Sequence, residues 1–206
     1  MSRCVIIGGA KINNPDVVRK YLNKDDFNIF CDSGLGHLKA LKIKADLIVG
    51  DFDSHEKPET DTPTIVLPCE KDDTDTMFAV KKGIEAGFEE FLIIGGVGER
   101  LDHTLGNVSA LLYLHSKGKK ATMIDDYSEI TVVAQESEYV EDSFAYFSLL
   151  SISGCARGVT VENAKYPLKD AEITCEYPYG ISNEVLKGKQ ARISVKEGQL
   201  LLIKVR

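Results

Sequence analysis

The chain has 206 residues, of which 43% are hydrophobic and 28% charged, a composition typical of globular proteins and not of disordered or fibrous ones. Its 25 basic and 32 acidic side chains give a net charge of −7, and without a long Lys/Arg cluster it is a poor candidate for binding nucleic acid. No apolar run approaches the roughly 18 residues that span a bilayer, and the N-terminal segment resembles a first strand more than a signal peptide, so we expect no membrane partner.

The first 125 or so residues alternate short β-rich runs with helical patterns. Apolar, mostly β-branched runs bounded by turn residues predict strands at 4–9, 28–32, 46–50, 64–68, 91–96 and 121–125. Capping residues and an apolar stripe predict helices over about 14–22, 75–86 and 102–117. This alternation predicts an α/β domain with an open, mostly parallel Rossmann-like sheet and helices on both faces.

After Asp126 the pattern changes to short strand-like runs with almost no helical period. They lie at 130–135, 139–142, 144–153, 158–163, 171–177, 191–198 and 199–205. The spacing predicts an all-β sandwich or roll. We therefore expect an α/β domain over residues 1–126 and an all-β domain over residues 127–206. A domain of about 80 residues has a marginal hydrophobic core of its own, so we expect the second domain to pack against the first or against a second subunit.

The cysteines indicate a reducing compartment. The five are scattered and contain no CxxC pair: Cys4, Cys31, Cys69, Cys155 and Cys175. This spacing argues against a disulfide framework or a zinc site. We therefore expect reduced thiols in a cytoplasmic protein, with Cys4 and Cys31 as small core residues.

The negative charge is concentrated in one segment. Residues 46–75 hold ten acidic and two basic side chains, a net charge of −8, and the other 176 residues have a net charge of +1. Within the segment, Asp51 and Asp53 directly follow a predicted strand, where open α/β sheets bind ligands. Residues two apart in an extended chain face the same way, and two close carboxylates favour a hard cation such as Mg²⁺ between them. A simple turn is the alternative interpretation.

A second acidic motif, residues 70–76, opens a predicted helix. Asp and Thr are common helix caps, but one cap suffices and this turn holds three aspartates and two threonines. A third carboxylate from this turn would complete a metal site begun by Asp51 and Asp53. Lys71, in the same turn, would then reach a phosphate.

A glycine-rich loop, residues 95–103, lies between a predicted strand and a predicted helix. It is neither a Walker A loop nor a dinucleotide fingerprint. Its glycines allow close approach of a ligand, the helix start favours anions, and Arg100 can hold phosphate oxygens in a bidentate way. Each feature alone is more often an ordinary surface feature. Together the three loops predict a Mg²⁺-dependent enzyme of phosphate transfer or hydrolysis, with the acceptor left open.

The order of the motifs identifies a family resemblance. CDSG (31–34), GDFDS (50–54), KDDTD (71–75), GxRLDHxxGN (98–107) and a late ISNE (181–184) together resemble bacterial thiamine pyrophosphokinase, over essentially the whole chain. The resemblance implies transfer of the diphosphoryl group of ATP to the hydroxyl of thiamine, with AMP and thiamine diphosphate as products. It also implies an ATP-binding α/β domain, a thiamine-binding β domain and a homodimer with active sites at the interface.

The resemblance also implies roles for individual residues. Mg²⁺ would be bound by Asp51, Asp53 and Asp75. Asp32 would lie beside the nucleotide or the metal. ATP would also lie beside Lys71, Gly96, Gly98, Arg100 and Asn107, and thiamine near Ser182 and Asn183. Arg100 and the metal would neutralise the transferred group, Asp102 would help organise the site, and Asp73 or Asp102 would accept the hydroxyl proton. Tyr177 or Tyr179 would lie against the cationic thiazolium ring, or else be an ordinary core or surface residue.

Three alternatives remain open from the sequence. A pyrophosphokinase of the same build that acts on a reduced pterin alcohol would differ only in the acceptor pocket. A phosphatase with a nucleophilic DxD pair usually has that pair after its first strand, whereas here it follows the third. A non-catalytic nucleotide or thiamine sensor would share the fold, although all the proposed catalytic carboxylates are present.

Overall fold

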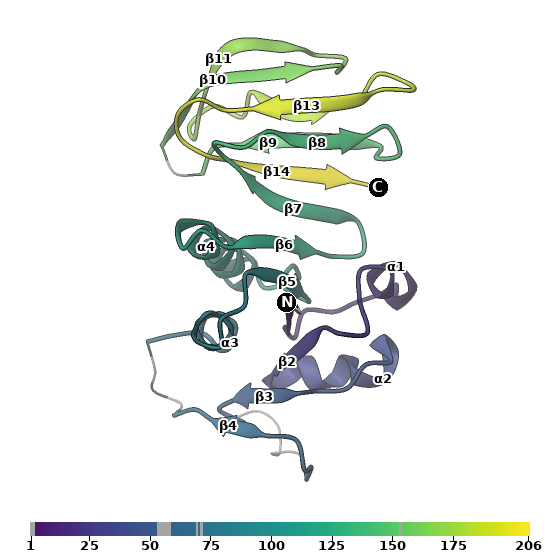
Figure 1. Cartoon of the computed structure of the whole chain (residues 1–206), viewed down its shortest axis with the longest axis vertical. Coiled ribbons are helices and arrows are strands. Elements are labelled where there is room, and N and C mark those ends of the chain that lie inside the picture. The colour runs from purple at the N-terminus through teal and green to yellow at the C-terminus, as the bar shows by residue number, and fades with distance from the viewer. Residues whose placement is uncertain (1–2, 53–58, 69, 71, 153) are drawn as a thin grey trace. The chain divides into compact units, whose positions relative to one another are not determined.

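The computed structural model describes residues 3–52, 59–68, 70, 72–152 and 154–206. Internal contacts divide the chain into two units, Met1–Asp126 and Tyr127–Arg206 (Figure 1). In the described part of the chain, no helix combines the length and the apolar character that crossing a membrane requires.

The first unit is a parallel sheet with helices. Its strands are β1 (Cys4–Ile7), β2 (Phe27–Cys31), β3 (Leu47–Gly50), β4 (Thr64–Val66), β5 (Glu90–Ile94) and β6 (Lys120–Ile124). Its helices are α1 (Pro15–Arg19), α2 (Leu38–Leu41), α3 (Asp75–Glu85) and α4 (Leu101–Ser116), with a 3₁₀ helix, η1 (Asp32–His37), before α2. The strands pair in parallel in the order β6-β5-β1-β2-β3-β4. The predicted α/β class is confirmed, but α1 is shorter than expected, and η1 and α2 were not predicted.

Helices cover both faces of this sheet. Val5 and Ile7 of β1 share a buried cluster with Val18 of α1 and Leu41 of α2. On the opposite face α3 packs closely, since a Cβ built on Gly83 would lie 2.5 Å from the ring of Phe91. Glycine inside a helix costs about 1 kcal/mol relative to alanine, and here it permits this close packing.

The order in which strands are added to the sheet reverses between β1 and β5, because β2–β4 lie on one side of β1 and β5–β6 on the other. The loops that follow these two strands are joined by backbone hydrogen bonds from Gly8 N to Ile94 O, 2.8 Å, and from Ala10 N to Gly95 O, 3.0 Å. Open α/β sheets bind ligands beyond the carboxyl ends of their strands at such a reversal. The fold therefore places the glycine-rich loop at an expected ligand-binding edge.

Of the four cysteines in the described residues, the two that are buried belong to the core of the first unit, as predicted. Cys4 and Cys31 are 0% and 4% exposed. Burial raises the pKa of the Cys4 thiol to about 12 and raises that of Cys31 as well. Both are therefore inert, protonated thiols at neutral pH.

A buried ion pair fastens β1 to the turn before β2. Asp26, whose side chain is 2% exposed, accepts hydrogen bonds from Arg3 Nη2 at 2.8 Å and Arg3 Nε at 3.2 Å. We expect Arg3→Met to lower the free energy of unfolding by about 3 kcal/mol, because it leaves a buried carboxylate without its cation. Urea denaturation measures this. Arg19→Met, which removes a partly exposed pair with Asp16, is the control, and equal losses in the two variants would contradict the prediction.

The second unit is a β-sandwich. Its strands are β7 (Ser128–Val133), β8 (Glu138–Glu141), β9 (Tyr146–Leu150), β10 (Cys155–Glu162), β11 (Leu168–Thr174), β12 (Gly180–Asn183), β13 (Gln190–Ser194) and β14 (Leu200–Val205). They form antiparallel layers in the orders β12-β9-β14-β7 and β11-β10-β13-β8. Phe147 and Leu149 of β9 share one buried core with Val159 and Val161 of β10. The all-β prediction is confirmed, although β12 was not predicted as a strand.

Candidate functional site

Three carboxylates converge at the carboxyl edge of the first unit's sheet. Asp32 directly follows β2, Asp51 directly follows β3, and Asp75 is the first residue of α3. One carboxylate oxygen from each lies within 4.8 Å of the others. Because β2 and β3 are neighbouring parallel strands, the residues after them leave the sheet side by side.

The local backbone is unusual where these carboxylates meet. Asp32 has φ 25° and Phe52, next to Asp51, has φ 53°, values that cost a non-glycine residue of order 1 kcal/mol or more. Gly50 lies so near that a Cβ built on it would be 3.0 Å from Asp32 Cβ. The lack of a side chain at Gly50 therefore lets the end of β3 approach Asp32.

Two side-chain contacts hold the start of α3, one at the cap residue Thr74 and one at Asp73 just before it. Thr74 Oγ1 accepts a hydrogen bond from Met77 N at 3.2 Å, which caps the helix. Just before it, both oxygens of Asp73 accept from Lys81 Nζ, at 2.8 and 2.7 Å. The hydrogen bond to Asp73 raises the pKa of Lys81, so Lys81 stays charged at neutral pH.

The glycine-rich loop is tied to the helix that follows it. Asn107 Nδ2 donates to the carbonyl of Gly96 at 2.8 Å, and Thr104 Oγ1 accepts from Gly98 N at 3.1 Å. Asn107 lies well inside α4, so its amide fixes the loop from the helix side. Both predicted glycine positions are thus held at the amino end of α4, where an anion is favoured.

Arg100 and Asp102 form a two-point pair at the start of α4. Arg100 Nε and Nη2 donate to the two Asp102 oxygens at 3.0 and 2.6 Å. The hydrogen bond from Arg100 holds the pKa of Asp102 well below its usual range, which makes Asp102 a weak proton acceptor. A guanidinium has five N–H donors, so the pair orients Arg100 and leaves three donors to offer to a phosphate.

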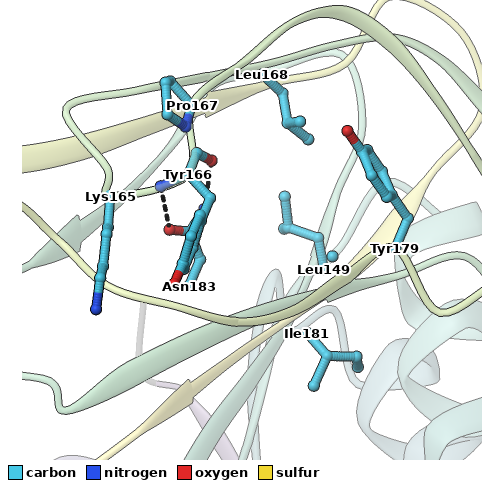
Figure 2. A pocket seen from close by; sticks show the side chains of 9 residues that line it. Leu149, Lys165, Tyr166, Pro167, Leu168, Tyr179, Ile181 and Asn183 are labelled. Atoms are coloured by element: carbon cyan, nitrogen blue, oxygen red, sulfur yellow. Dashed lines mark hydrogen bonds between the residues drawn. The ribbon is translucent and has the colours of Figure 1, made fainter.

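In the second unit, Asn183 fixes backbone. Its Oδ1 accepts from Tyr166 N at 3.0 Å, and its Nδ2 donates to Tyr166 O at 2.8 Å (Figure 2). The same Oδ1 accepts from Glu184 N at 2.9 Å. The neighbouring Ser182 has φ 57° and its N–H donates to Ser148 Oγ at 3.0 Å. The Asn183 amide therefore fixes the backbone of Tyr166, and with it the position of the Tyr166 side chain.

A pocket of about 420 Å³ adjoins Asn183. It is lined by Leu149, Lys165, Tyr166, Pro167, Leu168, Tyr179, Gly180, Ile181 and Asn183. Figure 2 shows the Tyr166 and Tyr179 side chains on either side of Leu149. The Tyr179 ring also stacks on Tyr177, with ring centroids 6.3 Å apart. Lys165 adds a cation to the lining, its Nζ 5.6 Å from the centre of the Tyr166 ring. Aromatic walls with a polar rim suit a flat, partly apolar ligand.

The sequence-predicted residues are thus grouped in three places. Asp51 and Asp75 lie together with Asp32, which was expected beside the nucleotide or metal, while Asp53 and Lys71 lie outside the described residues. Gly96, Gly98, Arg100, Asp102 and Asn107 form the loop and helix start, and Ser182 and Asn183 adjoin the pocket of the second unit. Lys81 was missed, because its contact with Asp73 arises only when the segment before α3 folds back along the helix.

The chain is similar to known proteins over nearly its whole length. The family model for the thiamin pyrophosphokinase catalytic domain matches residues 18–123, and the model for its vitamin B1 binding domain matches residues 130–200. The thiamine pyrophosphokinase of Bacillus subtilis (strain 168) is 28% identical over 97% of this chain and 96% of its own. The crystal structure of the B. subtilis enzyme matches with a TM-score of 0.85 at 25% identity, covering 100% of this chain and 99% of that one. That of thiamin pyrophosphokinase from Geobacillus thermodenitrificans matches with a TM-score of 0.84 at 26% identity, covering 99% and 97%. The chain therefore belongs to the thiamin pyrophosphokinase family, diphosphotransferases that use ATP and thiamine.

Proposed function

We propose that the chain transfers the diphosphoryl group of ATP to the hydroxyl of thiamine at the carboxyl edge of the first unit's sheet. The observation that carries this proposal is the convergence of Asp32, Asp51 and Asp75, whose oxygens lie within 4.8 Å of one another. ATP in complex with a cation needs such a carboxylate group beside a source of positive charge. Arg100 would supply that charge in this unit.

The three carboxylates fit Mg²⁺ by chemistry and by spacing. Mg²⁺ prefers oxygen ligands at about 2.1 Å in an octahedron, which places ligand oxygens about 3 to 4 Å apart. The three oxygens lie within 4.8 Å of one another, and small side-chain rotations would bring them to this spacing. We propose Asp32, Asp51 and Asp75 as ligands, with Asp53 retained from the sequence prediction. When bound, Mg²⁺ would neutralise charge on the phosphate oxygens.

The chain's own groups would orient and stabilise the transferred unit. Arg100, held by Asp102, would donate to phosphate oxygens, and the backbone at Gly96 and Gly98 would approach them closely. Lys71 is retained as a further phosphate contact from the sequence. Phosphoryl transfer has a loose transition state that demands little from a base, so we propose that Asp102 orients Arg100 and does not take the thiamine proton.

We propose the pocket of the second unit as the thiamine site. Tyr166 and Tyr179 would pack against the aromatic rings of thiamine and interact with its cationic thiazolium. Ser182 lies next to the pocket and Asn183 lines it. Asn183 would act by fixing Tyr166.

We further propose a cytoplasmic homodimer with active sites at its interface. Tyr177, Tyr179 and Ile181 are 67%, 53% and 48% exposed, and apolar side chains gathered on one surface favour a protein partner. The four cysteines in the described residues are free thiols, as suits a reducing compartment.

An AMP-release assay tests the proposed reaction. With ATP, Mg²⁺ and thiamine we expect AMP and thiamine diphosphate in equal amounts, and no AMP when thiamine is replaced by a hydroxymethylpterin. Release of AMP with the pterin and not with thiamine would favour the alternative pyrophosphokinase. Absence of AMP with both acceptors would favour a sensor.

A further inference from the structure

Lys81 makes a contact that sequence spacing does not predict. Its ammonium binds both oxygens of Asp73, at 2.8 and 2.7 Å, and the two side chains are 42% and 29% exposed. An α-helix rises about 1.5 Å per residue, which puts Lys81 about 9 Å beyond Asp75 along α3. Asp73 meets Lys81 only because the segment before the helix folds back along it.

The same segment presents Asp75 to the other two carboxylates. Asp73 is followed by the cap Thr74 and then by Asp75. The segment carries three carboxylates, those of Asp72, Asp73 and Asp75, which repel one another and the carboxylates of Asp32 and Asp51. It therefore needs an attractive contact to stay close to Asp32 and Asp51. Lys81 provides one, since it is a cation in direct contact with the segment.

We propose that Lys81 is a positioning residue for the metal-binding carboxylates. By holding Asp73 it fixes the segment that carries Asp75 beside Asp32 and Asp51. The inference rests on the metal site proposed above. It also gives Asp73 an anchoring role in place of the proton-accepting role expected from the sequence.

The next residue of α3 provides a matched control. Lys82 forms an ion pair with Glu85 at 2.6 Å, with side chains 37% and 63% exposed. This pair joins two positions of the same helix and anchors no loop. Exposed pairs of this kind contribute little to stability, so removing Lys82 deletes the same charge from the same helix without releasing the segment before it.

The test measures Mn²⁺ binding to the ATP-free protein by calorimetry. We expect Lys81→Met to weaken Mn²⁺ binding about tenfold, the low end of the loss seen when the residues that support metal ligands are removed, and Lys82→Met to leave it unchanged. Lys81→Arg should restore most of the affinity, and adding Asp73→Asn to Lys81→Met should weaken it no further. A pure charge effect has the opposite sign, because removing a nearby cation strengthens binding of a metal cation.

Two other outcomes would overturn the inference in different ways. If Asp75→Asn abolishes Mn²⁺ binding while Lys81→Met leaves it unchanged or tighter, Lys81 is not a positioning residue and the metal site stands. If Asp75→Asn also leaves Mn²⁺ binding unchanged, the metal site itself is wrong and the positioning role falls with it. Thermal unfolding of each variant checks that the fold is retained.

Discussion

Replacing Asp75 by Asn is expected to lower kcat for diphosphoryl transfer about 1,000-fold, equal to roughly 4 kcal/mol of transition-state stabilisation. Asn keeps the size of the side chain but removes one of the three charges that converge within 4.8 Å. The remaining two carboxylates would hold the metal less firmly, so the Mg²⁺ concentration for half-maximal activity should also rise. AMP release followed across a Mg²⁺ titration measures both quantities.

The control for this variant is Asp61→Asn. Asp61 is exposed and belongs to the same acidic segment, but it is not one of the three converging carboxylates. Its replacement removes an equal charge and should leave kcat and the Mg²⁺ requirement unchanged. Near-normal activity in Asp75→Asn, or an equal loss in Asp61→Asn, would show that the converging carboxylates do not form the metal site.

The three converging carboxylates could be predicted from the sequence only in part. Asp51 follows an apolar run that reads plainly as a buried strand, and Asp75 opens a helix with its cap beside it, so both could be placed at the sheet edge. Asp32 joins them because β2 lies beside β3 and because its backbone has φ 25°. Strand order and a left-handed backbone at a non-glycine residue are results of tertiary packing, which periodicity does not encode.

Asn183 shows a different limit of sequence reasoning. The ISNE motif placed this residue near thiamine, and it does line the pocket. Its amide is nevertheless engaged with the backbone of Tyr166 and Glu184. A motif identifies the residue type that a site requires, but whether the amide meets the ligand or holds the wall depends on hydrogen bonds that only the folded chain reveals.

Three proposed roles share one physical pattern, in which a charged or polar side chain acts through a neighbour. Asn183 holds Tyr166, Lys81 holds Asp73, and Asp102 holds Arg100. Preorganisation of this kind lowers the reorganisation needed when charge develops on the transferred group. Substitution of these supporting residues should therefore alter binding or rate without unfolding the protein.

Replacing Arg100 by Ala is expected to lower kcat about 100- to 1,000-fold, the loss typical of removing one preorganised donor to a developing anion. Arg100→Lys should recover only part of the rate, because Lys keeps the charge but lacks the planar fork that binds Asp102 and phosphate at once. Steady-state AMP release at saturating ATP and thiamine measures the effect. Thermal stability should not change, since the Arg100 and Asp102 side chains are 69% and 64% exposed and such pairs contribute little to folding.

Arg157→Ala is the matched control for Arg100, because Arg157 also pairs with a carboxylate, Glu172, at 2.9 Å on the surface of the second unit. It should leave kcat unchanged.

The Arg100–Asp102 pair also predicts the acid side of the pH profile of the rate. A lowered pKa keeps Asp102 charged as the pH falls towards the usual range of a carboxyl group, so this pair should cause no loss of rate between about pH 5 and 8. In Asp102→Asn that orienting charge is gone at every pH, and the rate should fall uniformly across the same range. A fall confined to low pH in the unaltered protein, and abolished by Asp102→Asn, would show instead that Asp102 titrates during catalysis.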